Sequence, residues 1–140
     1  MLFSQGIPLM STPALSLQKI GQIAINAKDV PAAKAFYRDV LGLKHLFDAG
    51  PNLAFFDCGG VRVMLTPPSA PEFDHPSSVI YFPVSDIDVA HAELVRAGVK
   101  IERAPQLIAK MPDHELWMCF FRDPAANLLA LMAEKRPSRP

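Results

Sequence analysis

Apolar and polar side chains alternate along residues 22–26, where Ile23 and Ile25 are flanked by polar or small residues. This two-residue period is typical of a strand whose two faces meet different surroundings. Further along, apolar residues recur every three or four positions, as on one side of a helix, between Asp29 at an N-cap position and Gly42 at a stop position. The pattern therefore predicts a strand followed by a helix, with both helix ends marked.

The same strand–helix pattern returns later in the chain. A second alternating segment covers residues 79–84, and a second helix is predicted between Asp86 and Gly98. Asp86 follows Asp29 by 57 residues and Gly98 follows Gly42 by 56, so the second helix is one residue shorter. A repeat of this length is typical of stacked supersecondary modules, and we interpret it as an old duplication.

Short strands are predicted after each helix. In the first copy they cover residues 44–48, 52–58 and 61–67, and Gly59-Gly60 supplies a two-residue hairpin turn. In the second copy we expect a strand at 100–103, a long irregular excursion at 104–115 and a closing hairpin at 116–134 with its turn at 123–127. Each copy thus has the order βαβββ. The copies are joined by a linker, residues 67–77, which contains four prolines.

The predicted fold class is α+β, with two βαβββ modules at about 19–67 and 78–134 whose sheets curl around a shared concave cavity. One such module cannot cover the sheet face that lacks a helix, so two modules are expected to enclose it together. Residues 1–17 are predicted to be an irregular N-terminal extension. The single domain covers residues 18–134, and residues 135–140 form a C-terminal tail.

Strand parity predicts which side chains face the cavity. The set is Gln22, Asn26, Phe55, Met64, Tyr81 and Ala130. An apolar floor with a few directing polar groups suits a small organic ligand that bears one carbonyl or carboxylate, and plain packing is the alternative explanation of the same lining. Asp57 and Arg62 face each other across the hairpin, which favours an ion pair at the rim over binding of a substrate carboxylate.

Composition excludes several classes of partner. The 140 residues include 14 acidic and 14 basic side chains, so there is no electrostatic footprint for nucleic acid or an anionic membrane. No apolar run approaches the roughly 20 residues that span a bilayer, and the first residues lack the basic start of a secretory signal. Cys58 and Cys119 are predicted to be buried thiols rather than a disulfide, which indicates a reducing, cytoplasmic location.

Two stretches carry a family resemblance. The sequence Phe-Tyr-Arg-Asp-Val-Leu-Gly-Leu at 36–43, together with Phe-Arg-Asp-Pro at 121–124 and Asn127, resembles the vicinal oxygen chelate superfamily of glyoxalases, bleomycin resistance proteins and dioxygenases. The resemblance covers roughly residues 19–134 and implies the two-module fold predicted above. The family typically has glycine with a positive φ where this chain has Ala126, so we expect a strained turn or a different turn type there.

The resemblance also implies where a metal would be bound. Family members with metal chemistry place ligands, commonly His or Gln, Glu, His and Glu, on inward strand positions. Carried over one at a time, these positions fall on Gln22, Met64, Val79 and Ala130. One donor out of four cannot hold a divalent cation, so we predict no metal centre and no cofactor.

The excursion at 104–115 carries functional groups without an evident structural purpose. Lys110, His114 and the following Trp117 are expected to border the cavity mouth, because long loops with ionisable and aromatic residues are often lids. The alternative is a solvated loop that Trp117 anchors to the core. His114 beside Asp113 is a candidate general base.

Two other side chains are candidates near the same opening. Tyr81 offers a ring for stacking and a hydroxyl for catalysis, or it is a half-buried structural tyrosine. His75 in the linker is expected to reach the opening, whereas His45 and His91 are interpreted as surface residues without a role.

The favoured function is binding of a small organic molecule by a metal-independent protein similar to the bleomycin-resistance branch. The alternative is a glyoxalase-like lyase or isomerase that uses His114 or Tyr81, or that recruits a cation through Gln22 and loop residues. A purely structural role is the weakest hypothesis. We also expect a homodimer, because pairing would cover open sheet edges, with the N-terminal extension lying across the partner.

Overall fold

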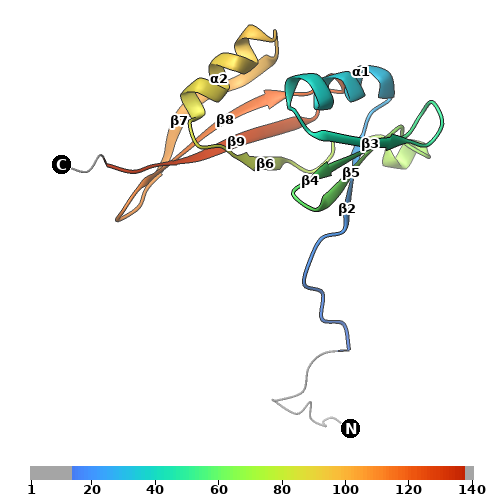
Figure 1. Cartoon of the computed structure of the whole chain (residues 1–140), viewed down its shortest axis with the longest axis horizontal. Helices are drawn as coiled ribbons and strands as arrows, with labels where there is room; N and C mark the ends of the chain where they lie inside the picture. Colours follow the sequence, from blue (N-terminus) through green and yellow to red (C-terminus); the bar gives the residue numbers. More distant parts are fainter. Residues whose placement is uncertain (1–13, 138–140) are drawn as a thin grey trace.

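The computed structural model describes residues 14–137 (Figure 1). In chain order the elements are β2 (Gln22–Asn26), α1 (Val30–Ala35), the π-helical turn η1 (Phe36–Val40), β3 (Lys44–Asp48), β4 (Ala54–Cys58), β5 (Val61–Thr66), the 3-10 turn η2 (Pro71–Phe73), β6 (Ile80–Pro83), α2 (Ile87–Arg96), β7 (Lys100–Lys110), β8 (Glu115–Arg122) and β9 (Leu128–Lys135). They form two four-stranded sheets with the orders β2-β5-β4-β3, here sheet 1, and β6-β9-β8-β7, here sheet 2. The predicted α+β class with a repeated βαβββ order is confirmed.

The predicted boundaries of the first helix are confirmed. The Asp29 carboxylate accepts a hydrogen bond from the backbone N–H of Ala32 at 3.1 Å, and Gly42 has a φ of 75° where the helix ends. The helix changes type along its length, because the backbone N–H of Leu41 donates to the carbonyl of Phe36, five residues back, at 3.0 Å. The predicted single helix is therefore α-helical first and π-helical in its last turn.

The second helix has the same capping and stop residues as the first, but its last turn is α-helical and not π-helical. The Asp86 carboxylate accepts from the backbone N–H groups of Asp88 and Val89, each at 3.1 Å, and Gly98 follows the helix with a φ of 78°. Figure 1 shows α1 and α2 on the same side of the two sheets. The opposite sheet faces, which carry no helix, are called the open side below.

One core joins the two modules on the helix side. It includes Tyr37 and Phe56 of the first module and Phe121 and Leu129 of the second, all at most 1% exposed. The ring of Phe36 lies 6.5 Å from that of Phe121, so the helix of one module packs on the sheet of the other. Burial of these large apolar side chains is the main stabilising contribution to the pairing of the modules.

The hairpin at Gly59-Gly60 has the predicted register, with Phe55 opposite Met64 and Asp57 opposite Arg62. The predicted ion pair between Asp57 and Arg62 is wrong, since no such salt bridge forms within residues 14–137. Instead, the Arg62 guanidinium lies over the ring of Phe55, 5.8 Å from its centroid. The face of a buried aromatic ring thus takes the place of the carboxylate as the partner of this cation.

The irregular excursion predicted at 104–115 is also wrong. Strand β7 continues to Lys110 and pairs with β8 as far as Glu115, so that only a short turn remains, closed by a bond from the N–H of Met111 to the carbonyl of His114 at 2.8 Å. Three irregularities in the pairing of β7 interrupt its alternation, and Pro105 breaks the strand pattern further. Because β7 is an edge strand, it accepts both features.

Residues 14–21 lead away from the body of the molecule before β2 (Figure 1). Leu15, Leu17 and Ile20 are exposed, Leu17 to 86%. The remainder of the predicted N-terminal extension lies outside the described residues. No helix within residues 14–137 combines the length and apolar character needed to cross a bilayer.

Both cysteines carry free thiols, as predicted. Cys119 is buried in β8 and Cys58 is half-buried at the end of β4. Burial raises the pKa of each thiol, so the neutral form, which is the less reactive one, is favoured.

Candidate functional site

The turn between β8 and β9 binds the two modules together. One carboxylate oxygen of Asp123 accepts from the backbone N–H groups of Ala125 and Asn127, at 2.9 and 2.8 Å. The other accepts from the Tyr37 hydroxyl at 2.8 Å and from the Asn127 side-chain amide at 2.9 Å. Burial, reinforced by the negative charge of Asp123, raises the pKa of Tyr37, so its hydroxyl remains protonated and donates. We call this arrangement the clasp.

The clasp extends to β2 and to the linker. The Asn127 amide also donates to the carbonyl of Asn26 at 2.8 Å, and its oxygen accepts from the backbone N–H of Ser77 at 3.1 Å. The backbone N–H of Asn26 donates to the hydroxyl oxygen of Ser77 at 2.8 Å. The sequence stretches that resemble the family thus meet in space, and their polar residues hold the two modules and the linker together.

The side chain of Asn26, a predicted ligand-binding residue, is bonded to the linker. Its Nδ2 donates to the Asp74 carboxylate at 3.3 Å and to the His75 carbonyl at 3.2 Å. Its Oδ1 is buried and has no hydrogen-bond partner in the described chain. Asn26 therefore shapes the wall of a site more than it presents a free amide to a ligand.

A groove of about 550 Å³ lies on the open side of sheet 1. Ala24, Met64 and Thr66 form its floor, on β2 and β5. The linker forms the opposite wall, with Phe73, His75, Ser77 and neighbouring proline and serine residues lining it. Of the predicted site residues, Asn26 and Met64 line this groove.

A second hollow, of about 430 Å³, is lined by linker residues and by the clasp turn. Its charged groups are engaged with one another, because Lys28 and Asp74 form an ion pair at 2.7 Å and Asp29 caps α1. The pair with Lys28 lowers the pKa of Asp74. The groove on sheet 1 is therefore the better candidate for a ligand, because it combines an apolar floor with hydroxyl groups.

Two other predicted residues, Gln22 and Phe55, lie beside the groove on the same sheet face. The amide of Gln22 is 3.8 Å from the sulfur of Met64, and Phe55 is the strand partner of Met64. Phe47 on the neighbouring strand stacks on Phe55, with ring centroids 4.6 Å apart. The register and the Gln22–Met64 contact place Gln22, Phe55 and Met64 on one sheet face.

Tyr81 and Ala130 lie on the open side of sheet 2. They are strand partners, and the next strand places Phe120 beside Ala130, with its ring 6.1 Å from that of Tyr81 and at 83° to it. Tyr81 is 45% exposed. The groove has none of these three side chains among its lining residues, so the predicted common pocket is divided between two sheets.

The positions at which metal-binding relatives hold a cation do not fit one here. Gln22 supplies an amide, Met64 a thioether, and Val79 and Ala130 no donor atom. Within residues 14–137 there is no group of three or more histidine, cysteine or acidic side chains arranged to hold a metal ion. Gln22 is thus the one oxygen donor at these four positions, and a single donor cannot hold a hard or borderline cation.

The three residues predicted at the cavity mouth, Lys110, His114 and Trp117, are not brought to the groove. His114 lies at the end of the β7–β8 hairpin, which extends away from β2 (Figure 1), and its ring nitrogens are 2.8 Å from Asp113 and 3.8 Å from Glu134. Lys110 is at the same end. This geometry gives His114 no reacting partner at the groove, because its neighbours are carboxylates of the hairpin and of β9.

Trp117 lies on the helix side of sheet 2, against the core, and not on the open side. Its indole N–H donates to Glu115 at 3.0 Å, and the Lys135 ammonium lies 4.1 Å from the ring centroid. The alternation of β8 explains this placement, since Cys119 and Phe121 on the same parity are buried. The proposal that anchored Trp117 to the core is thus the one that the geometry favours.

The end of the hairpin is tied to the C-terminal end of β9. Arg136 forms ion pairs with Asp113 at 2.8 Å and Glu134 at 2.6 Å. The bond from Arg136, followed by that from His114, lowers the pKa of Asp113 to about 2. These groups satisfy one another, which indicates a structural role.

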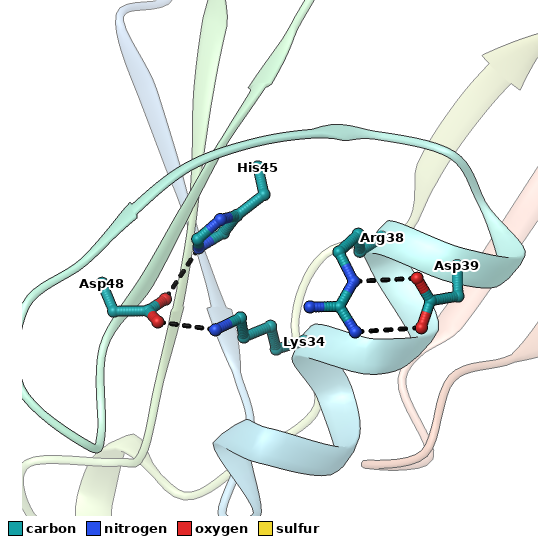
Figure 2. A network of polar contacts seen from close by, with 5 residues as sticks. All are labelled: Lys34, Arg38, Asp39, His45 and Asp48. Carbon is teal, nitrogen blue, oxygen red and sulfur yellow. Dashed lines mark hydrogen bonds and ion pairs between the residues drawn. The ribbon is translucent and has the colours of Figure 1, made fainter.

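A further polar network joins the first helix to β3 (Figure 2). The Asp48 carboxylate accepts from the Lys34 ammonium at 2.6 Å and lies 2.8 Å from His45 Nε2, while Arg38 and Asp39 pair within the helix. The bond from Lys34, followed by that from His45, lowers the pKa of Asp48. His45 also places the edge of its ring against Phe56, with centroids 5.3 Å apart, so its contacts connect helix and sheet.

The sequence interpretation missed the linker as part of the site. His75, which was expected at the cavity opening, lies in the groove wall together with the serine and proline residues of the linker. The available signal was the co-occurrence of prolines, serines, Phe73 and His75 in one short stretch, which is more than a spacer requires.

Comparisons with known proteins agree with this fold. A family model described as the glyoxalase/bleomycin resistance protein/dioxygenase superfamily matches residues 19–131. A comparison with curated protein sequences found no match.

Several solved structures share the fold. Lactoylglutathione lyase from Agrobacterium tumefaciens has 24% sequence identity and a TM-score of 0.68, covering 84% of this chain and 95% of its own. TnmS3, an antibiotic binding protein from a Streptomyces species, has 20% identity and a TM-score of 0.70, covering 86% and 99%. A glyoxalase/bleomycin resistance protein/dioxygenase from Alicyclobacillus acidocaldarius has 20% identity and a TM-score of 0.64, covering 83% and 91%. At these identities the similarity shows the fold alone.

The family model covers most of the chain, and Tyr37, Asp123 and Asn127, which build the clasp, lie in the stretches that resemble the family. This chain therefore belongs to the glyoxalase/bleomycin resistance protein/dioxygenase superfamily.

Proposed function

We propose that this protein binds a small organic molecule in the groove on the open side of sheet 1, without the metal centre that some members of the superfamily use. The observation that carries the proposal is the groove itself: about 550 Å³, with an apolar floor at Ala24 and Met64 and a wall of linker side chains. Volumes of this size and apolar linings with a few polar groups are typical of small-molecule sites.

The polar groups of the wall favour a ligand with a carbonyl or hydroxyl group. The Ser77 oxygen already accepts from Asn26, so its own hydroxyl hydrogen is available to a ligand acceptor. His75 Nδ1 lies 3.1 Å from the carbonyl oxygen of Pro76 and therefore carries the proton in the neutral ring, which leaves Nε2 as an acceptor. The groove wall thus contains one donor and one acceptor in addition to the apolar floor.

Binding is supported over catalysis by the residues that the groove contains. A glyoxalase-like lyase or isomerase needs a positioned acid–base pair or a metal ligand set. Met64 stands at an inherited ligand position, and His114 is bonded to Asp113 at the far hairpin. One structural neighbour is an antibiotic binding protein and another is a lyase, so both functions occur on this fold.

We further propose a homodimer in which the open sides of two copies face each other. Phe47 and Tyr81 on the open side are nearly half exposed, and Leu15 and Leu17 precede β2 without cover within the described chain. A second copy would remove these apolar side chains from water, and the N-terminal residues of one copy would lie across the other. Light scattering at micromolar concentration tests this, and a monomeric mass would contradict it.

The groove is tested by filling it. Ala24 is exposed on the groove floor, so Ala24→Trp should occupy the space with little effect on stability, because aromatic residues are well tolerated in strands. The matched control is Ala92→Trp, on the exposed face of α2. A fragment library is screened by native mass spectrometry and thermal shift against the three proteins.

Ligands that bind the parent protein and the Ala92 variant but not the Ala24 variant would support the proposal. Retention of the same ligands by the Ala24 variant, or a library without any ligand, would refute it.

A further inference from the structure

The groove on sheet 1, as residues 14–137 form it, is lined without a formally charged side chain. Its eleven lining residues are apolar, hydroxyl-bearing, amide or imidazole side chains, and none is an aspartate, glutamate, lysine or arginine. These four types make up 20% of the chain, so eleven residues taken at random would include about two of them. Sheet and linker both belong to one chain, so a second copy is not needed to complete this lining.

The linker holds its carboxylate Asp74 outside the groove. Asp74 stands between two groove residues, Phe73 and His75, yet it lines the second hollow. There it pairs with Lys28 at 2.7 Å and accepts from the Asn26 amide at 3.3 Å. The bond from Lys28 lowers the pKa of Asp74, so the carboxylate stays ionised with its charge compensated. An ion in the groove would thus find no counter-ion among the lining residues of the described chain.

Binding in such a groove costs an ion more free energy than it costs a neutral molecule. An ionised carboxylate or ammonium gives up strong hydration on entering an apolar hollow, and without an opposite charge the protein does not offset this loss. A neutral amide or hydroxyl gives up less, because single hydrogen bonds to protein hydroxyls replace its bonds to water. The lining therefore discriminates by charge.

The hydroxyl groups of the groove can pair with a neutral polar group of either kind. Ser77 accepts from the backbone N–H of Asn26 at 2.8 Å and keeps its hydroxyl hydrogen to donate. The Thr66 hydroxyl donates to the Pro67 carbonyl at 3.1 Å, which leaves its oxygen as an acceptor. The lining thus contains a neutral donor for a ligand carbonyl and a neutral acceptor for a ligand N–H.

An aromatic side chain stands exposed in the groove wall. Phe73, in the turn η2, is 53% exposed although it is apolar. Met64 lies on the floor of the same groove, and a thioether makes favourable contacts with aromatic rings. A flat ring bound between wall and floor would remove apolar surface of Phe73 from water and form an aromatic pair with it. A two-ring compound is small enough for a groove of about 550 Å³.

We propose that the groove selects uncharged aromatic molecules over ionised analogues of the same shape, with the ring against Phe73 and Met64. This inference rests on the proposed function, binding in this groove, and names the ligand class. Phe73 determines the preference for an aromatic ring, and the uncharged lining determines the preference against ions.

Four probes of similar shape test the proposal with the full-length protein. Naphthalene-2-carboxamide is neutral, naphthalene-2-carboxylate is an anion, naphthalen-2-ylmethylammonium is a cation, and decahydronaphthalene-2-carboxamide lacks the aromatic ring. Affinities are measured by calorimetry at fixed ionic strength and at pH 8, where imidazole is mostly neutral. The aromatic amide should bind about tenfold or more tightly than either ion, and several-fold more tightly than the saturated amide.

Variants assign each preference to the groove. Ala24→Trp should remove binding of the aromatic amide by filling the floor. Phe73→Leu, at an exposed position, should weaken the aromatic amide several-fold and leave the saturated amide nearly unchanged. Ser78→Arg puts a cation into the lining and should tighten binding of the carboxylate about tenfold, whereas Ala92→Arg, on the exposed face of α2, should not.

The proposal is overturned if the parent protein binds either ion as tightly as the amide, if Ser78→Arg gains no more affinity for the carboxylate than Ala92→Arg, or if no probe binds. The proposed function is judged separately, by whether Ala24→Trp removes ligands found in the library screen. If those ligands are lost while the probes show no preference for the neutral compound, the proposed function stands and only the uncharged aromatic class is refuted.

Discussion

The helix side and the open side of the two sheets differ in how completely their functional groups are paired. On the helix side, Asp123 and Asn127 are 5% and 2% exposed, and both carboxylate oxygens of Asp123 accept hydrogen bonds. On the open side, Tyr81 keeps an exposed ring and Arg103 has no acidic partner in the described part of the chain. The polar groups on the helix side are paired within the protein, whereas the open side leaves aromatic and charged side chains exposed to solvent.

This difference explains why the sequence predicts the family but does not predict the ligand. The residues that carry the resemblance, Tyr37, Asp123 and Asn127, pair the modules, and that requirement holds for any ligand. The positions that would hold a metal in relatives are on the open side, where Met64 and Ala130 now stand. The residues that join the modules and the residues that would bind a ligand or metal therefore lie on opposite faces of the sheets. Substitutions in one set need not affect the other.

The largest expected effect is loss of the clasp. Asp123→Ala leaves the Tyr37 hydroxyl and two backbone N–H groups without their acceptor in a buried site, which should lower the free energy of unfolding by about 3–5 kcal/mol. Urea denaturation measures this, with Asp39→Ala, an exposed residue of η1, as the control. If the alanine variant does not fold, Asp123→Asn, which keeps one acceptor oxygen, serves in its place. If the free energy of unfolding falls by less than about 1 kcal/mol, the paired groups on the helix side do not stabilise the fold more than those on the open side.

A gain in stability is expected within the same turn. Ala126 has a φ of 66°, so the predicted strain is present: the turn keeps the left-handed conformation although the residue is not glycine. That conformation costs alanine about 1–2 kcal/mol, and glycine loses about 0.4–1 kcal/mol through its freer unfolded chain. Ala126→Gly should therefore raise stability by about 0.5–1 kcal/mol. Ala125→Gly, without a positive φ, should lower it; equal effects of the two changes would contradict this explanation.

The smallest effect is expected on the open side. Arg62→Gln removes the cation over the ring of Phe55 at a solvent-facing position, and such a contact contributes only about 0.5 kcal/mol. The same denaturation experiment should thus give nearly superimposable curves for parent and variant. A decrease of more than about 2 kcal/mol in the free energy of unfolding would mean that the open side also stabilises the fold, and that the two sides do not differ in this respect.

Local signals made the module plan predictable. Asp29 and Asp86 cap their helices, Gly42 and Gly98 end them, and Gly59-Gly60 sets the hairpin register, because each acts through its own backbone geometry. Strand parity then placed Met64 on the open face correctly.

The parts that were missed depend on pairing between distant segments. Strand β7 has three irregularities, so its alternation is visible only beside β8. The parity of Trp117 follows from that pairing, and its assignment to the cavity mouth was therefore not supported. The linker became part of the groove because Ser77 binds both Asn26 and Asn127, two contacts that no pattern of residues along the chain indicates.

The π-helical turn η1 at Phe36–Val40 bears on how the two copies diverged after the duplication. The first helix has one residue more than the second between matching Asp and Gly positions, and η1 accommodates it. At the offset of 57 residues Tyr37 corresponds to Leu94, which has no hydroxyl, and the turn that corresponds to Asp123–Asn127 is Gly59-Gly60, which has no carboxylate. Each half has kept only one member of the pair that joins them. A chain built from two first halves, or from two second halves, would lack either the acceptor or the donor, so the halves have become complementary and can no longer be exchanged.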